Sequence, residues 1–240
     1  MIELKNLTVA FSDKIVLDNI DLTFRKNENT VIVGKSGCGK SVLVKTIAGL
    51  IIPVRGIVLI DGEDIFSLRR KALHRVRKKL AMLFQGAALL DSLNVYQNVA
   101  LPLFEHTSLT EDQIYEIVSS KLAIVGLHGI HTIMPAELSG GMKKRVALAR
   151  AIIMEPEYII YDEPTTGLDP GIAAEITELI MLLQETLNVT SLVISHDLDF
   201  IEKISNRIVM INEKKIFFDG SFQDFKKARS KEIKMFIREI

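Results

Sequence analysis

The feature that most constrains this chain is an eight-residue loop, GKSGCGKS, which runs from Gly34 to Ser41 and matches G-x-x-x-x-G-K-[ST]. An apolar run (30–33) precedes the loop, and a segment compatible with a helix (42–50) follows it. Glycines let the backbone gather its N–H groups into a concave surface, and the following helix directs its positive end to the same point. The order strand, loop, helix therefore predicts a phosphate-binding site.

Each polar residue of this phosphate loop (residues 34–41) has an expected role. Lys40 adds a point charge for the β- and γ-phosphates of a nucleotide, and the Ser41 hydroxyl suits Mg²⁺. The predicted nucleotide contacts are Gly34, Lys35, Ser36, Gly37, Cys38, Gly39, Lys40, Ser41 and Val42. Two interpretations of Cys38 stay open. The first, which we favour, is a small residue at a position where only the backbone matters; the second is a thiol of lowered pKa beside Lys40, open to alkylation.

Composition limits the class of protein. The chain has 240 residues, 30 basic and 30 acidic side chains and one cysteine, so one large domain with a sub-lobe and no intrachain disulfide is expected. The balanced charge gives no global indication of nucleic-acid binding. No apolar stretch approaches the roughly 18 residues that span a bilayer, and the first residues do not resemble a secretory signal. We expect a cytoplasmic protein.

The pattern along the chain predicts an α/β fold, a P-loop NTPase core with a mainly parallel sheet, an antiparallel β subdomain and an all-helical subdomain. Alternating apolar and polar residues predict antiparallel strands at 2–11 and 15–25. Strand and helix signals alternate in the second half, which is typical of a wound parallel sheet. The predicted division is a single domain (1–240) with a core (1–85 and 156–220), a helical subdomain (86–155) and a C-terminal helix (221–240). The spacing of Phe222, Phe225, Ile233, Phe236 and Ile240 predicts that this helix packs on the body rather than entering a membrane.

Four polar residues follow predicted strands. Glu163, His196 and Gln85 join Lys40 as the candidates for catalysis, and Asp162 joins Ser41 and Gln85 as a candidate metal ligand. Asp162 and Glu163 end the apolar run 158–161, which places them at the carboxyl edge of the sheet, where α/β folds bind ligands. Asp162 is expected to hold Mg²⁺ through water, and Glu163 to polarise the attacking water. His196 follows the strand 191–195 and can orient the same water, while Gln85 closes the strand 80–84 and can reach Mg²⁺ or the water.

A second phosphate-binding helix start lies at Ser139, Gly140 and Gly141, within Leu-Ser-Gly-Gly-Met. One nucleotide does not need two such cradles from the same chain. We therefore expect this signature segment (residues 139–141) to serve a nucleotide that is held by another copy.

These motifs, GKSGCGKS, Gln85, LSGGM, YDEP, Gly167-Leu168-Asp169 and His196, occur in the order found in the ABC-transporter ATPase family, which the chain resembles over essentially its whole length. The resemblance implies a head-to-tail dimer with two ATP molecules between the phosphate loop of one subunit and the signature segment of the other. It also implies that Asp169 belongs to the loop linking the two sites. Phe11 stands where the family has an aromatic residue that stacks on adenine.

Within that family, the runs MLFQGAALLDSLNVYQNVALPLFEHT and MPAELSGGM resemble the ATPases of Mla/MCE-type lipid transport systems. That resemblance implies an integral-membrane permease of the MlaE type, an MCE-domain substrate-binding protein, and phospholipid or another hydrophobic cargo. It also implies a peripheral position on the cytoplasmic face of the inner membrane. A basic run (69–79) admits a lipid-headgroup or nucleic-acid role, although a solvated helix face is the interpretation we favour.

Three other functions stay open. A non-transport ABC ATPase acting on DNA or ribosomes would carry long coiled-coil insertions or a second cassette, and neither is present here. A mechanical ATPase on a division-type membrane protein would share every ATPase motif, and only the segment from Gly86 to Thr107 argues against it. The third possibility is an ATPase of another importer or exporter class.

Overall fold

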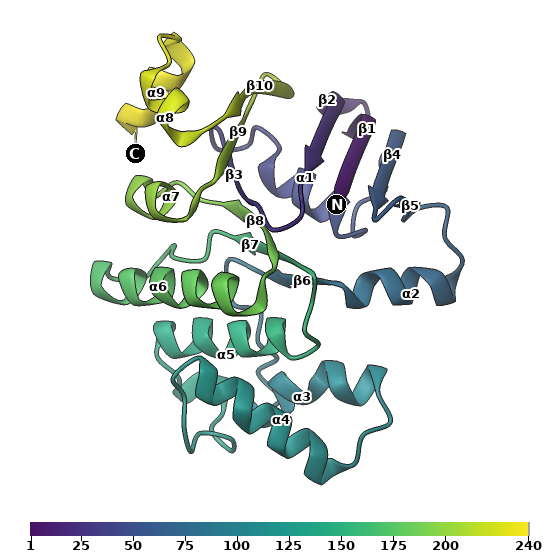
Figure 1. The fold of residues 1–240 in the computed structure, drawn as a ribbon, viewed down its shortest axis with the longest axis vertical. Helices are drawn as coiled ribbons and strands as arrows, with labels where there is room; N and C mark the ends of the chain where they lie inside the picture. The colour runs from purple at the N-terminus through teal and green to yellow at the C-terminus, as the bar shows by residue number, and fades with distance from the viewer. Residues whose placement is uncertain (240) are drawn as a thin grey trace.

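The computed structural model describes residues 1–239 and contains two β-sheets with helices around them (Figure 1). The strands are β1 (Ile2–Phe11), β2 (Lys14–Phe24), β3 (Asn29–Val33), β4 (Arg55–Ile60), β5 (Glu63–Asp64), β6 (Leu80–Leu83), β7 (Tyr158–Asp162), β8 (Thr190–Ile194), β9 (Arg207–Asn212) and β10 (Lys215–Gly220). The helices are α1 (Lys40–Ile47), α2 (Arg70–Lys78), α3 (Val95–His106), α4 (Glu111–Ile124), α5 (Gly140–Ile152), α6 (Pro170–Leu187), α7 (Leu198–Ile204), α8 (Phe222–Lys227) and α9 (Lys231–Glu239), with a 3₁₀ turn at Pro135–Glu137.

The first sheet is antiparallel and has the order β2-β1-β4-β5. The alternation along β1 buries Leu4, Leu7 and Val9 while residues between them stay at least partly exposed. β1 pairs with β2 from Ile2 opposite Phe24 to Phe11 opposite Lys14. The predicted antiparallel strands at 2–11 and 15–25 are therefore confirmed.

The second sheet has the order β10-β9-β3-β8-β7-β6. All pairs are parallel except β10 with β9, so the predicted mainly parallel sheet is confirmed. Strands β3, β7 and β8 are almost entirely buried, as expected for strands covered on both faces. Their carboxyl ends meet at one edge, and the residues that follow them form the candidate site.

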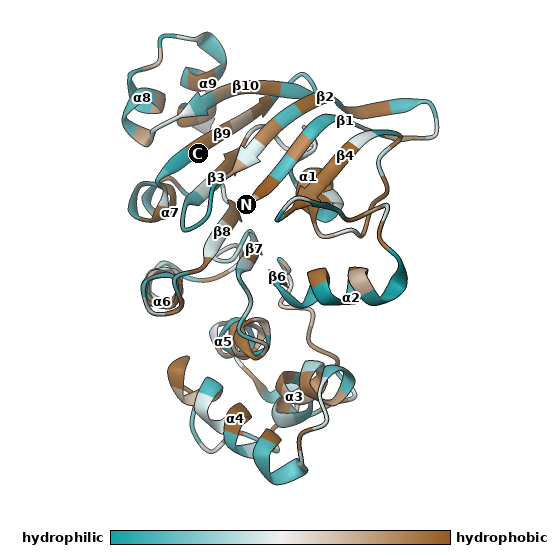
Figure 2. Ribbon diagram, turned by 45° about the vertical axis from the view of Figure 1, so that its right-hand side comes forward, coloured by the Kyte–Doolittle hydropathy of each residue, from teal (hydrophilic) through white to brown (hydrophobic). Residues whose placement is uncertain are grey.

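Neighbouring residues of β3 and β7 point into two different hydrophobic clusters, one on each face of the parallel sheet. Ile32 and Ile160 join a cluster with α1 and the antiparallel sheet. Ile159 and Tyr161 join a second cluster that contains α3 to α7. Figure 2 shows the hydrophobic colour along β4 and on α1, which belong to the first cluster.

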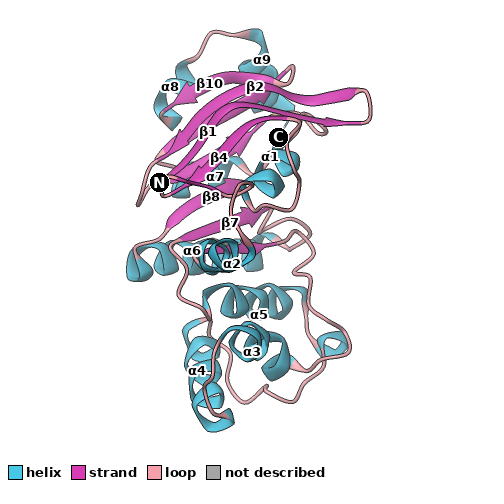
Figure 3. Cartoon of the chain, turned by 90° about the vertical axis from the view of Figure 1, so that its right-hand side faces the viewer, coloured by secondary structure: helices cyan, strands magenta, loops and turns pink. Residues whose placement is uncertain are grey.

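Helices α3, α4 and α5 gather at one end of the molecule and the strands at the other (Figure 3). Asn94 and Thr110 begin α3 and α4 with capping boxes, in which the cap side chain and a glutamine three residues later exchange hydrogen bonds with the backbone. These helices lie within the helical subdomain predicted for residues 86–155. None of the helices in the described chain has the length and apolar character needed to cross a bilayer.

The C-terminal segment forms two helices, where the sequence predicts a single one over 221–240. Backbone angles at Ala228 leave the helical region, so α8 ends there and α9 begins at Lys231. Phe222, Phe225, Ile233 and Phe236 are all buried, as the apolar spacing predicts. Ile240, the last residue of that pattern, lies outside the described residues.

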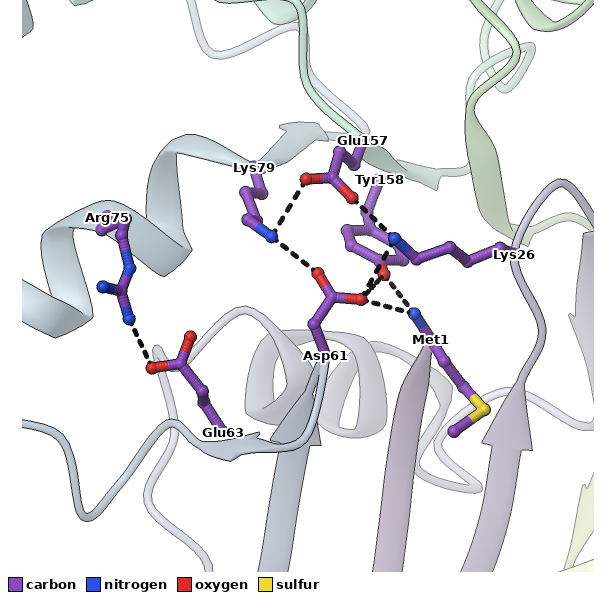
Figure 4. A network of polar contacts seen from close by, with 8 residues as sticks. All are labelled: Met1, Lys26, Asp61, Glu63, Arg75, Lys79, Glu157 and Tyr158. Carbon is purple, nitrogen blue, oxygen red and sulfur yellow. Dashed lines mark hydrogen bonds and ion pairs between the residues drawn. The ribbon is translucent and has the colours of Figure 1, made fainter.

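A network of charged and phenolic groups joins the two sheets at the start of β7 (Figure 4). Its members are Met1, Lys26, Asp61, Lys79, Glu157 and Tyr158. Asp61 accepts hydrogen bonds from Lys79 Nζ at 2.8 Å and from Tyr158 Oη at 2.6 Å. Burial on its own would raise the pKa of Asp61, but the hydrogen bonds from Lys79, the Met1 amino group and Tyr158 bring that pKa well below its usual range.

Candidate functional site

The phosphate loop curls between the end of β3 and the start of α1. Gly39 is the N-cap of α1 and has φ 112°, a left-handed conformation that favours glycine. Gly34 has φ 145°, and a Cβ there would lie 2.4 Å from the carbonyl oxygen of Ile211. Both positions therefore require glycine, and the predicted strand–loop–helix unit is confirmed.

Lys40, the first residue of α1, is buried and turns its ammonium group back into the phosphate loop. Its Nζ donates to Gly34 O at 2.7 Å and to Lys35 O at 3.1 Å. Burial lowers the pKa of Lys40, whereas Cys38, Glu163 and Asp162 oppose that shift. Lys40 lines the same cleft as Ser36, Gly37, Gly39 and Ser41 of the loop, a position suited to a phosphate contact.

Ser41 and Asp162 lie together beneath the loop, with Ser41 Oγ donating to Asp162 Oδ1 at 3.4 Å. Burial raises the pKa of Asp162, and the neighbouring charge of Glu163 raises it further, while Lys45, Ser41 and Lys40 lower it. The chemistry of these donors, a hydroxyl beside a buried carboxylate, fits a hard divalent cation such as Mg²⁺. The residues predicted to hold the metal are thus brought together, and Gln85 lies beside them through its contact with Glu163.

Glu163 is the centre of the site. Its Oε2 accepts from Gln85 Nε2 at 2.8 Å and from Thr166 Oγ1 at 3.2 Å, while Oε1 lies 3.1 Å from His196 Nε2. Its backbone has φ 51°, and its N–H donates to Ile194 O at 2.9 Å. A left-handed glutamate is unusual and is typical of functional positions where the surrounding structure holds the backbone.

His196 follows β8 and faces Glu163, as expected. Burial and the charge of Lys40 lower the pKa of His196, while Glu163 raises it. A neutral imidazole at this position can donate one N–H to the carboxylate. The geometry therefore brings together the three residues that the sequence predicts for water activation, Gln85, Glu163 and His196.

An open cleft of about 620 Å³ runs past these groups. Its lining residues are Val16, Ser36, Gly37, Gly39, Lys40, Ser41, Val42, Gln85, Glu163 and His196. Phe11 ends β1 at the hairpin and is exposed, outside this lining. The volume and polarity of the cleft suit the phosphates of a nucleotide.

Cys38 corrects one hypothesis. Burial raises the pKa of the Cys38 thiol, and the opposing effect of Lys40 is smaller. The predicted lowering of the Cys38 pKa is therefore wrong, and the favoured interpretation of a small residue within the loop stands.

The signature segment lies apart from this cleft, at the start of α5. Ser139 is the N-cap, and its side chain accepts from Met142 N at 3.2 Å. Ser139 and Gly140 are exposed, whereas Gly141 is buried against α6, where an added Cβ would lie 2.6 Å from Ile172 Cγ2. Ser139 and Gly141 border a separate cavity of about 390 Å³.

Asp169 is the N-cap of α6, with Pro170 as the first helical residue. Its Oδ1 accepts from Ile172 N at 3.1 Å. Asp169 therefore has a local role in α6 besides the one in the dimer loop that the family resemblance implies.

Three residues near the site were not identified from the sequence. Thr166 donates to Glu163, and Lys144 reaches the backbone around it. Phe236 of α9 lies with its ring centroid 6.4 Å from that of His196. Thr166 lies three residues after Glu163, and this short spacing is the only sequence signal for their contact. The contacts of Lys144 and Phe236 depend on the tertiary fold.

Residues 17–166 match the ABC transporter family. The chain is 42% identical over 238 residues to the intermembrane phospholipid transport system ATP-binding protein MlaF of Haemophilus influenzae, covering 99% of this chain and 90% of that protein. It is 40% identical over 219 residues to the probable ribonucleotide transport ATP-binding protein mkl of Mycobacterium tuberculosis, covering 91% of this chain and 61% of that protein. Among solved structures, the dimeric ATP-binding cassette MJ0796 bound to ADP and Pi matches with a TM-score of 0.83 and 29% identity, covering 92% of this chain and 98% of that one.

Proposed function

The chain belongs to the ABC transporter family of ATPases, and from that premise we propose that it powers the movement of phospholipid, or another hydrophobic cargo, through a membrane permease. The observation that carries the proposal is the 42% identity to an MlaF protein over 99% of this chain, which includes the helical subdomain as well as the ATP-binding core. The mkl relative matches at similar identity but over a smaller share of its own length. Ribonucleotide, the substrate in the name of that relative, is an alternative cargo.

Each residue of the site has a distinct role in ATP hydrolysis in this proposal. Lys40 and the loop N–H groups bind the β- and γ-phosphates, and Phe11 stacks on the adenine. Ser41, Gln85 and Asp162 would hold Mg²⁺, which supplies positive charge to the phosphates. Glu163 accepts a proton from the attacking water as general base, a role worth roughly 10²–10⁴-fold in rate. His196 and Gln85 orient that carboxylate through the contacts at 3.1 and 2.8 Å.

A second copy completes each site in this proposal. Ser139 and Gly140 are exposed and are not among the residues that line the chain's own cleft, which suits a role toward a nucleotide held by another subunit. The MJ0796 cassette, which this chain resembles, is a dimer. Asp169 lies near the start of α6, beside the signature segment, and would join the two sites of the dimer.

The permease is expected to dock beside the helical subdomain. An apolar groove of about 240 Å³ lies between the end of α1, α2 and β6, and its lining includes Leu50, Leu73, Met82 and Phe84. Leu50 is exposed and Ile52, two residues further along the chain, is 76% exposed, which leaves an unusual amount of aliphatic surface in water. We assign this surface to an MlaE-type permease at the cytoplasmic face of the inner membrane. An MCE-domain protein is the further component expected in the assembled transporter.

The proposal is tested by purifying the tagged Glu163→Gln chain from its native membranes with ATP and Mg²⁺, followed by mass spectrometry of proteins and lipids. The expected result is an MlaE-like permease, an MCE-domain protein and phospholipid. Lys40→Ala is the matched control, because it should lose ATP-dependent association. Recovery of a division-type membrane protein, ribosomes or DNA without a permease would overturn the assigned transport function and leave the ATPase chemistry intact.

A further inference from the structure

Lys144 is a buried lysine whose contacts are backbone carbonyl groups. It lies in the second turn of α5 and its side chain is 4% exposed. Its Nζ donates to Gln85 O and, at 3.3 Å, to Glu163 O. Within residues 1–239 it forms no ion pair with a carboxylate. Burying an ammonium group costs free energy unless its N–H groups donate hydrogen bonds, so these two carbonyl groups determine where the side chain lies.

Both carbonyls belong to residues whose side chains meet in the candidate site. Gln85 Nε2 donates to Glu163 Oε2 at 2.8 Å, so Lys144, Gln85 and Glu163 form a closed ring of hydrogen bonds. The ring joins three segments that are distant in sequence, namely α5, the end of β6 and the end of β7. Displacement of any one segment therefore changes the position of the Glu163 carboxylate.

The conformation of Glu163 explains why its carbonyl needs a partner. With φ 51°, the residue is in the left-handed region, which a side chain disfavours. Its N–H is held by Ile194 O at 2.9 Å, and its C=O is held by Lys144. The two contacts fix the peptide groups on both sides of the strained residue.

Lys144 also connects the site to the signature segment. Ser139 caps the same helix five residues earlier, which corresponds to about 7.5 Å along the helix axis. Figure 1 shows α5 between the parallel sheet and the other helices of the helical subdomain, and Gly141 packs closely on Ile172 of α6. A movement of the α5 N-terminus is therefore transmitted to Lys144 by a rigid helical segment.

We propose that Lys144 is a positioning residue that holds Glu163 and Gln85 in place for water activation and links that geometry to the signature segment at the start of α5. This inference rests on the proposed function, because it takes Glu163 as the group that activates water. A purely structural lysine would affect folding and nucleotide affinity without selective loss of turnover. A positioning lysine affects kcat, since a misplacement of about 1 Å at the reacting groups costs on the order of 10²-fold.

The test is steady-state ATP hydrolysis by the intact chain carrying Lys144→Met, Lys144→Gln or Lys144→Arg, with thermal unfolding measured in parallel. Lys121→Met is the matched control, because Lys121 is also buried in the helical subdomain but pairs with Glu155 at 2.9 Å, away from the cleft. We expect Lys144→Met to lower kcat roughly 10- to 100-fold with the KM for ATP changed less than about twofold. Arginine, which also donates several hydrogen bonds, should restore most of the activity, and Lys121→Met should retain it.

Glu163→Gln separates this inference from the proposed function. Normal turnover in Glu163→Gln would refute the assumed role of Glu163. Loss of turnover in Glu163→Gln with normal kcat in Lys144→Met would refute only the role of Lys144. The role of Lys144 would also be refuted if Lys144→Met raised KM at unchanged kcat, or if Lys121→Met lowered kcat as much as Lys144→Met does. If Lys144→Met does not fold, the comparison of the glutamine and arginine variants decides: slow turnover with glutamine and normal turnover with arginine support the inference, and equal turnover contradicts it.

Discussion

Replacing Gly141 by alanine should weaken the packing of α5 on α6, although alanine favours a helix more than glycine does. The new Cβ would lie 2.6 Å from Ile172 Cγ2, about 1 Å closer than an ordinary carbon–carbon contact. Ile172 is β-branched and stiff at χ1, and it lies in the first turn of α6, so relief requires movement of that turn. Overpacking of this kind costs about 1–3 kcal/mol, and the gain in helix propensity is about 1 kcal/mol. The expected net loss of stability is thus up to about 2 kcal/mol.

Gly140→Ala is the matched control, because its Cβ would lie 3.4 Å from Leu168 Cδ2, an ordinary contact. The two variants should differ by about 1–3 kcal/mol in the free energy of unfolding, measured by urea denaturation. In thermal melts the difference should be about 2–4 °C per kcal/mol for a chain of this size. Ile172→Ala removes the clashing methyl group, so its cost should be smaller in the Gly141→Ala background than in the parent chain.

Equal stability of Gly140→Ala and Gly141→Ala would refute the reasoning. Additive effects of Gly141→Ala and Ile172→Ala would contradict it as well, because they would show that the two side chains do not meet. Either result would mean that close packing on α6 does not explain the glycine at position 141.

Three further predictions concern single side chains. Asp61→Asn should lower the free energy of unfolding at pH 7 by about 1–3 kcal/mol and make it depend less on pH in acid. The pKa of Asp61 is lowered in the folded state, so its contribution to stability is present above the unfolded pKa near 4 and is lost as the pH falls toward the folded pKa. Urea midpoints measured between pH 3 and 7 test this, and an identical pH dependence in the parent and Asp61→Asn chains would contradict it. The alkylation rate of Cys38 should keep rising beyond about pH 8.5, because burial raises the pKa of the thiol; a plateau near pH 7 would contradict this. Lys40→Ala should weaken ATP binding in calorimetry by about tenfold or more, through loss of a charge-assisted phosphate contact, and unchanged affinity would remove Lys40 from the phosphate site.

The parts of this protein that the sequence predicts correctly depend on short, local patterns. The phosphate loop lies within eight residues, and its glycines adopt positive φ angles that other residues rarely adopt. Glu163 and His196 were found because each follows an apolar strand, and parallel strands end at one edge of the sheet. The start of α6 also has a local signal, because Asp169 is followed by proline at the first helical position.

The parts that could not be predicted depend on contacts across the fold. Lys144 stands in a Lys-Lys-Arg run that resembles a solvated helix face, and its partner Gln85 is 59 residues away. The C-terminal residues keep one apolar spacing across the break at Ala228, because α8 and α9 pack on the same body. Burial raises the pKa of Cys38, whereas the charge of Lys40 and backbone hydrogen bonds lower it, and of these causes only the charge of Lys40 is visible in the sequence.

The opposite orientations of Ile159 and Ile160 have a consequence for how such proteins diversify. Ile160 faces the layer that supports the phosphate loop, and Ile159 faces the layer built with α3 to α7. Substitutions on opposite sides of a rigid sheet share no contacts, so their effects on stability should add. Apolar residues of the helical layer can therefore be repacked around a different membrane partner while the nucleotide layer keeps its packing, provided that α5 holds the signature segment and Lys144 in place.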